Sequence, residues 1–145
     1  MPSRKLCLIL QERLMCSNFV LCISLNIFTW FCFSDTSGSY YYDSKAFLFS
    51  FVNNPGWAPL KLPQTGKRNS SIRCHSTLGP TFGGGYDIVI YINARSNSNS
   101  YSNLGWTYSP PSGYSYGSTF ARTFLAGTHR FTPDEVETFY KTTWT

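Results

Sequence analysis

The segment most suggestive of a reactive site is a run of three glycines, Gly83–Gly85. A glycine-rich loop can hold a phosphate when a Lys-Ser/Thr pair follows it and a helix N-terminus faces the anion. Here no lysine follows, and the triplet leads into Asp87–Ile92, an apolar run typical of a strand. The sequence therefore predicts a structural role for the triplet, as a turn that needs a positive φ or a close backbone approach.

Cys74 and His75 are adjacent and could form a nucleophile and its base. Neighbouring residues on a strand point to opposite faces, however, so the two side chains cannot form a dyad with each other. The second histidine of the chain is His129, and no spacing places it beside Cys74. We interpret both residues as structural, with redox chemistry at Cys74 as the one enzymatic alternative left open.

The remaining ionisable residues show no catalytic or metal-binding pattern. Asp134, Glu135 and Glu137 form an acidic cluster near the C-terminus, which is typical of a solvated face. Two histidines and a single cysteine after residue 34 do not give metal-ligand spacing. We therefore predict no catalytic, cofactor-binding or metal-binding residues, no cofactor, and a protein that is not an enzyme.

The composition indicates one small domain rich in strands. The chain has 145 residues, of which 18% are aromatic and 13% charged. This mixture excludes intrinsic disorder and a charge-rich helical bundle, while the 11 glycines and 8 prolines favour short strands joined by tight turns. The net charge of +5 is spread along the chain rather than gathered in a patch, so we expect no nucleic-acid partner.

The first 34 residues differ from the rest. Residues 14–34 contain no charge and follow Arg4, Lys5 and Arg13, a pattern typical of a transmembrane helix that would associate the chain with a membrane. This head also holds four of the five cysteines, which argues against a secreted disulfide framework. We divide the chain into an apolar head, 1–34, and a body, 35–145. The head is a membrane anchor, a mispredicted exon, or a buried helix or processing signal.

Within the body, hydrophobic patterning predicts four strands. They cover 46–52, 71–75, 87–92 and 119–125, and the third is expected to be central because both of its faces are apolar. Turns or loops are expected at 35–39, 57–69, 96–103 and 105–118, the third of them polar and exposed.

The C-terminal segment gives conflicting signals. Thr132, Pro133 and Glu135 are typical of a helix start, with a cap, a first-turn proline and an acid three residues after the cap. Val136, Thr138 and Tyr140 also fit one face of a strand. Local reasoning alone slightly favours the helix.

Four segments of the body resemble the TLDc domain, in the order and near the spacing of that family. They are Tyr42–Asn53, Leu78–Asp87, Ser102–Tyr108, and Phe124–Gly127 with Pro133–Phe139. The most specific part consists of Gly79, Pro80, Thr81, Phe82, Gly83, Gly84, Gly85 and Asp87. The resemblance covers roughly residues 35–140, and the apolar head stands where the family has the N-terminal part of its domain.

The resemblance implies a mainly β fold, an incomplete two-sheet antiparallel sandwich flanked by a few helices and here preceded by an apolar N-terminal helix. It also implies that the acidic C-terminal segment is a strand, and we adopt that assignment. The family is associated with protection against oxidative stress and with the vacuolar-type proton pump, and it offers no catalytic residues to carry over. We accordingly expect a cytoplasmic protein-interaction module that binds a protein partner such as pump subunits.

The alternative is an extracellular or lumenal, membrane-anchored β-sandwich. It would bind a ligand through the stretch Tyr101–Tyr116, whose Tyr, Trp, Ser and Asn content suits a recognition surface. Asn69 begins an N-glycosylation acceptor pattern that would support this reading.

Overall fold

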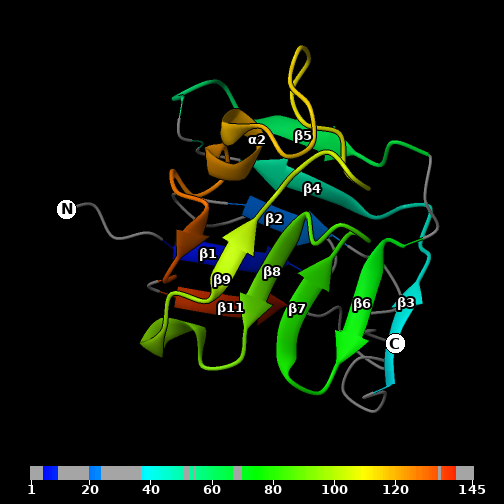
Figure 1. The fold of residues 1–145 in the computed structure, drawn as a ribbon, viewed down its shortest axis with the longest axis vertical. Helices are drawn as coiled ribbons and strands as arrows, with labels where there is room; N and C mark the ends of the chain where they lie inside the picture. The colour runs from blue at the N-terminus through cyan, green and yellow to red at the C-terminus, as the bar shows by residue number, and fades with distance from the viewer. Residues whose placement is uncertain are drawn as a thin grey trace, which may run out of the picture.

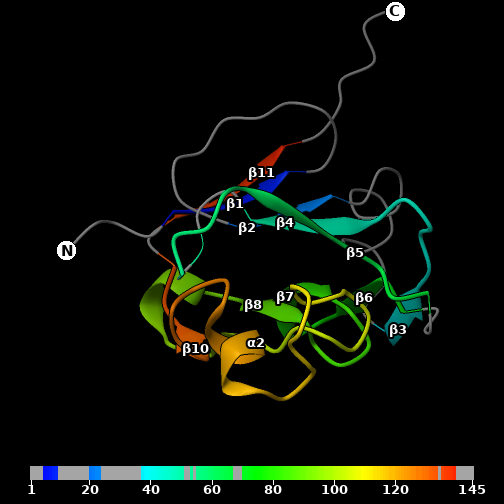
Figure 2. The same cartoon turned by 90° about the horizontal axis from the view of Figure 1, so that it is seen from above.

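The computed structural model describes residues 5–9, 20–23, 37–50, 53, 55–66, 70–133 and 135–139. These residues form two facing layers of β-strands, with a short helix, α2, beside one end of them (Figures 1 and 2). One layer is a six-stranded sheet in the order β10-β9-β8-β7-β6-β3. The other contains the sheet β2-β4-β5 and the pair β1-β11. The predicted fold class, a mainly β sandwich of two layers, is confirmed.

Every strand pair of the six-stranded sheet is antiparallel. Its strands are β3 (Ser37–Tyr41), β6 (Ile72–His75), β7 (Leu78–Phe82), β8 (Ile88–Tyr91), β9 (Ser100–Ser102) and β10 (Arg130–Phe131). The strand β8 lies inside the sheet, and its residues Ile88, Val89 and Ile90 are buried. The prediction that this strand is central is therefore confirmed.

The second layer combines the two ends of the chain with strands from its middle. It contains β2 (Val20–Ile23), β4 (Phe47–Ser50) and β5 (Leu60–Pro63), paired antiparallel. Beside them β1 (Lys5–Ile9) pairs in parallel with β11 (Glu135–Phe139). The C-terminal segment is thus a strand, as the resemblance implied, because pairing with β1 outweighs the local helix signals.

The helix expected in residues 14–34 is wrong at Val20–Ile23. These residues pair with β4 in a register that sets Cys22 opposite Leu48. A short apolar run fits a buried strand as well as a helix, and the neighbouring strand decides between them. The other residues of 14–34 lie outside the described part of the chain. Among the residues that the structure describes, no helix is long and apolar enough to cross a membrane.

Two expected loops contain strands. The strand β3 begins at Ser37, inside the expected turn at 35–39, and its register with β6 shifts between Ser37 and Tyr40. Residues 60–63 of the expected loop at 57–69 form β5, an edge strand of its sheet. A proline is tolerated at the end of an edge strand because its missing N–H removes no ladder bond there, which explains Pro63.

The polar segment 96–103 is a loop only in part and exposed only in part, since Ser96, Ser98 and Asn99 are exposed but the residues that follow them are not. After the 3-10 turn η1 (Ala94–Ser96) it forms β9, in which Ser100 and Ser102 are fully buried. The Ser100 Oγ accepts a hydrogen bond from Tyr91 N at 3.2 Å, and the Ser102 Oγ donates to Arg122 O at 2.9 Å. Burial of these hydroxyls is tolerated because each has a backbone partner.

The strand expected at 119–125 is instead the helix α2 (Thr119–Thr123). Ser118 caps it, since its Oγ accepts a hydrogen bond from Ala121 N at 3.1 Å. The helical turn places Ala121, and beyond it Phe124 and Leu125, in the core. The N-cap outweighs the β-favouring composition of this segment.

The core fills the space between the two layers. Register aligns Ile72, Phe82 and Ile88 on one face of the six-stranded sheet, and all three are buried. Leu48 and Leu62 from the second layer belong to the same cluster. Because side chains alternate along a strand, the adjacent row of the six-stranded sheet points away from the core.

Candidate functional site

The glycine triplet forms the turn between β7 and β8, as the sequence predicts. Gly83 has a φ of 86°, and its carbonyl accepts a hydrogen bond from Tyr86 N at 3.1 Å. Gly85 lies against the Trp106 side chain, and a Cβ on Gly85 would lie 2.6 Å from Trp106 Cγ. One glycine therefore provides the positive φ, and another provides the close approach.

Asp87, at the end of this turn, is fully buried and acts as an anchor for a second loop. Its carboxylate accepts hydrogen bonds from four consecutive backbone N–H groups. The donors are Gly105 at 3.0 Å, Trp106 at 3.1 Å, Thr107 at 3.1 Å and Tyr108 at 3.1 Å. Charge-assisted bonds of this kind are stronger than neutral ones, so Asp87 fixes the backbone of residues 105–108.

The environment of Asp87 shifts its pKa in two opposing ways. Burial raises the pKa from 3.8 to about 6, because desolvation disfavours the charged carboxylate. The backbone N–H groups of Tyr108, Thr107, Gly105 and Trp106 act in the opposite direction and lower it. The carboxylate is thus held by backbone dipoles.

Further contacts join the glycine turn to residues 105–108. Thr107 Oγ1 accepts a hydrogen bond from Gly84 N at 2.9 Å, and Tyr108 donates its hydroxyl to Ser71 O at 2.8 Å. Within the same loop, Trp106 packs against the ring of Tyr116, with the ring centroids 5.2 Å apart. The turn and the loop therefore form one fixed unit.

The rest of the motif packs along β7. A Cβ on Gly79 would collide with the carbonyl oxygen of Ile90, so only glycine fits there. Thr81 is buried and donates its hydroxyl to Gly79 O at 3.1 Å, while Phe82 belongs to the core. Pro80 is half-buried.

The structure keeps the two histidines apart. His75, on β6, contacts Thr77 through its Nδ1, whereas His129 contacts Ser102 O through its Nδ1, beside β9. These strands are separated by β7 and β8. Nothing is described of the side chain of Cys74, nor of those of Asp134, Glu135 and Glu137. In the described part of the chain, no three His, Cys, Asp or Glu residues are grouped as metal ligands would be.

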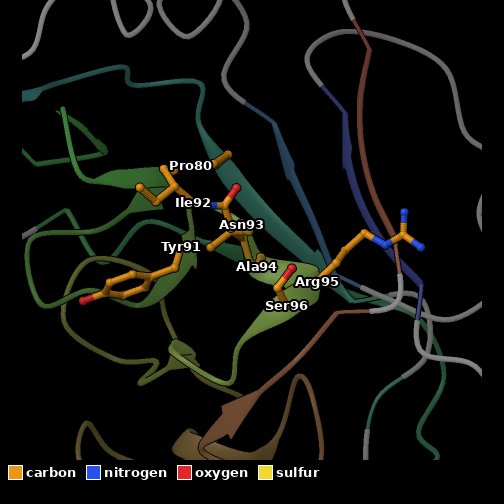
Figure 3. A pocket seen from close by; sticks show the side chains of 9 residues that line it. Pro80, Tyr91, Ile92, Asn93, Ala94, Arg95 and Ser96 are labelled. Carbon is orange, nitrogen blue, oxygen red and sulfur yellow. The ribbon is translucent and has the colours of Figure 1, made fainter.

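A hollow of about 690 Å³ lies beside η1 (Figure 3). Its lining comes from Gly79, Pro80 and residues 90–96. Figure 3 shows the side chains of Tyr91 and Arg95 leaving the hollow in opposite directions. The lining contains no carboxylate, histidine or cysteine, so it lacks the groups that usually carry acid–base catalysis.

Aromatic side chains, two of them exposed and one half-buried, gather next to α2. We call Trp57, Tyr114 and Phe120 the aromatic patch. Tyr114 stacks on Phe120 with the centroids 3.5 Å apart and the planes 11° apart, and Trp57 lies 5.4 Å from Phe120. Trp57 and Tyr114 are 44% and 39% exposed. Three separate segments thus present one apolar surface to solvent.

Each patch residue is held by local structure. Asn53 is buried and binds Trp57 at both backbone groups, since its Oδ1 accepts from Trp57 N at 2.8 Å and its Nδ2 donates to Trp57 O at 3.1 Å. Tyr114 follows a turn closed by its own N–H donating to Pro111 O, and Phe120 lies on α2. The composition of Tyr101–Tyr116 predicted a recognition surface in a stretch that includes Tyr114. Sequence reasoning missed Trp57 and Phe120 as partners of that stretch.

The fold and the motif together are those of a β-sandwich module without a recognisable catalytic centre in its described part. The family model of the TLDc domain matches residues 14–141, so the chain belongs to the TLDc domain family. The match begins ahead of residue 35, where the motifs alone placed the boundary, and it includes β2. Searches of the curated proteins and of the solved structures gave no match.

Proposed function

We propose that this chain is a non-catalytic protein-interaction module that binds its partner through the aromatic patch. Trp and Tyr are the residues most enriched among binding hot spots, and exposed apolar patches mark interaction sites. The observation that carries the proposal is the stack of Tyr114 on Phe120 beside Trp57. These rings are already arranged before binding, so little conformational entropy is lost when a partner covers them.

The TLDc family gives this proposal its biological setting. Its members are associated with oxidative-stress protection and the vacuolar-type proton pump, so we propose pump subunits as partners and the cytoplasm as the location. A membrane-spanning helix over residues 14–34 is no part of this proposal, because Val20–Ile23 form a strand that pairs with β4.

The test is capture of pump subunits by the purified full chain from a cell lysate. We expect the wild type to retain pump subunits and Trp57→Ala and Tyr114→Ala to lose most of them. Tyr42→Ala is the matched control, because Tyr42 is 53% exposed and lies outside the patch. Equal capture by all variants would overturn the role of the patch, and no capture by the wild type would overturn the pump as partner.

A second readout concerns protection. Cells that express the full chain should survive peroxide better than cells that do not, and Trp57→Ala should remove this benefit while Tyr42→Ala keeps it. Protection that persists in the Trp57 variant would show that the patch is not needed for it.

A further inference from the structure

The outer face of the six-stranded sheet carries an ordered row of side chains. The register sets six residues opposite one another across the sheet, namely Arg130, Tyr101, Val89, Thr81, Arg73 and Tyr40. The adjacent row, with Ile72 and Phe82, faces the core. The row with the two arginines therefore points away from the core.

Tyr86 completes this row from the glycine turn. Its positive φ of 56° directs the chain back toward β8, and its ring lies 6.2 Å from that of Tyr101 and 5.3 Å from the guanidinium of Arg73. The hydroxyl of Tyr86 also accepts a hydrogen bond from Arg73 Nη1. The ring thus lies across the middle of the row, where Thr81 and Val89 are fully buried.

The two guanidinium groups are held by aromatic rings. The Arg73 group lies 5.1 Å from the ring of Tyr40 as well as beside Tyr86, and the Arg130 group lies 5.5 Å from Tyr101. Arg73 Nε donates to Gly38 O at 3.0 Å, and Arg130 Nη1 donates to Asn99 O at 3.4 Å. In the described part of the chain these bonds leave Nη2 of each arginine available. We call Tyr40, Arg73, Tyr86, Tyr101 and Arg130 the Arg–Tyr row.

Among the described side chains, no carboxylate belongs to the outer face of the six-stranded sheet. Only Asp43 and Asp87 have described carboxylates, and neither belongs to the Arg–Tyr row. Asp87 is buried against residues 105–108, and Asp43 accepts a hydrogen bond from Lys45 N at 2.8 Å. The row therefore offers two fixed positive charges, with phenol rings between them, to a partner of opposite charge.

We propose that the Arg–Tyr row binds an extended acidic peptide segment of a partner protein, with one carboxylate at Arg73 and another at Arg130. The two arginines are four strands apart, so their Cα atoms are roughly 19 Å apart at about 4.8 Å per strand. An extended peptide rises about 3.3 Å per residue, so the two acids are separated by about five or six residues. The tyrosine rings contact the peptide between them.

The same spacing disfavours nucleic acid. Binding of a nucleic acid backbone requires several basic groups that neutralise closely spaced phosphates. Two arginines this far apart would neutralise too few of them, whereas they match two isolated carboxylates. This surface and its partner chemistry are distinct from the aromatic patch, so the proposal stands or falls separately from the proposed function.

The test measures binding of a fluorescent peptide to the full chain by fluorescence anisotropy. The peptide is built of serine and glycine with two glutamates about six residues apart, and its control carries glutamine at both positions. We expect binding of the glutamate peptide that weakens with salt, and weak or no binding of the control peptide. Equal binding of both peptides, or tighter binding of an oligothymidylate of similar length, would overturn the proposal.

Arginine variants locate the binding. Arg130→Gln removes an exposed charge and should weaken binding about tenfold, the loss of one charge-assisted hydrogen bond. Lys61→Gln removes the same charge from β5 in the other layer and should bind as the wild type does. Arg73→Gln should also weaken binding, and Arg130→Gln decides the question if Arg73→Gln fails to fold. A loss in Lys61→Gln equal to that in Arg130→Gln would contradict the proposed site.

Discussion

The carboxylate of Asp87 occupies the space that a side chain on Gly83 would need. A Cβ on Gly83 would lie 2.7 Å from Asp87 Cγ, and Gly83 itself has a φ of 86°. The glycine turn thus makes room for the anion, and the anion then binds the backbone N–H groups of residues 105–108. The two residues work as one joint between the β7–β8 turn and that loop.

Gly83→Ala should destabilise the protein more than an ordinary glycine substitution. It adds a steric collision with Asp87 to the cost of a positive φ, so we expect a loss of about 3 kcal/mol or more in the free energy of unfolding. Gly113→Ala is the matched control, because Gly113 has a φ of 89° and a Cβ added there would meet no atom within 4 Å, so it should cost about 1 kcal/mol. Urea unfolding measures both, and equal losses would contradict the role of Asp87 in this glycine requirement.

Asp87→Asn should weaken the joint. The amide keeps one acceptor oxygen but directs an NH₂ group toward backbone donors, which leaves buried N–H groups without partners. We expect the free energy of unfolding to fall by about 2–4 kcal/mol at neutral pH. Asp43→Asn provides the comparison, since the carboxylate of Asp43 accepts an exposed hydrogen bond from Lys45 N, and should cost less. A larger loss in the Asp43 variant would show that the anchor at Asp87 contributes little.

Asp87 also makes stability depend on pH. Its pKa is about 6 in the folded protein and 3.8 in the unfolded chain, so between these values the folded state holds a proton that the unfolded state has released. The contribution of this group to the free energy of unfolding is therefore full below pH 3.8 and is lost as pH rises through about 6, by up to about 3 kcal/mol. The stability difference between wild type and Asp87→Asn should shrink as pH rises between these values. Parallel pH profiles of the two proteins would contradict the raised pKa.

Ser118→Ala should loosen α2. The substitution removes the acceptor for Ala121 N at the start of a helix of five residues, so we expect a loss of about 1 kcal/mol. Thermal unfolding gives the measurement, with Ser112→Ala at an exposed turn as the control that should change little. Because Phe120 lies on α2, the near-ultraviolet circular dichroism of the aromatic patch should change with the Ser118 variant. An unchanged spectrum and an unchanged melting temperature would show that the cap is dispensable.

Local pattern identified the strands that are most apolar. The run at 87–92 has apolar residues on both faces, and only an interior strand of a sheet buries both. The C-terminal strand could not be obtained in this way, because Thr132 and Pro133 favour a helix start and the deciding partner, β1, is far away in sequence. The family resemblance supplied that long-range information.

In two of the misassigned segments the outcome depends on a serine hydroxyl that bonds a backbone group. Ser102 is typical of a loop, but in the folded protein its hydroxyl donates a hydrogen bond to Arg122 O. Ser118 acts as a helix cap only once α2 has formed. At the candidate site, the glycine triplet indicated a turn through the residue type alone. The backbone of residues 105–108 donates its hydrogen bonds to Asp87, and Trp57 contacts Phe120, only in the folded protein. No local sequence pattern predicts these tertiary contacts.

The parallel pair β1-β11 sets the order of events during synthesis. Lys5 lies opposite Glu135, so the N-terminal strand has no partner for this edge until the last strand has been made. At about 5–20 residues per second, the roughly 130 residues between them take on the order of ten seconds to translate. An unpaired strand edge can join another chain during that time. Nascent chains on neighbouring ribosomes can therefore compete for β1, and slow elongation before the codons of β11 would give them more time to do so.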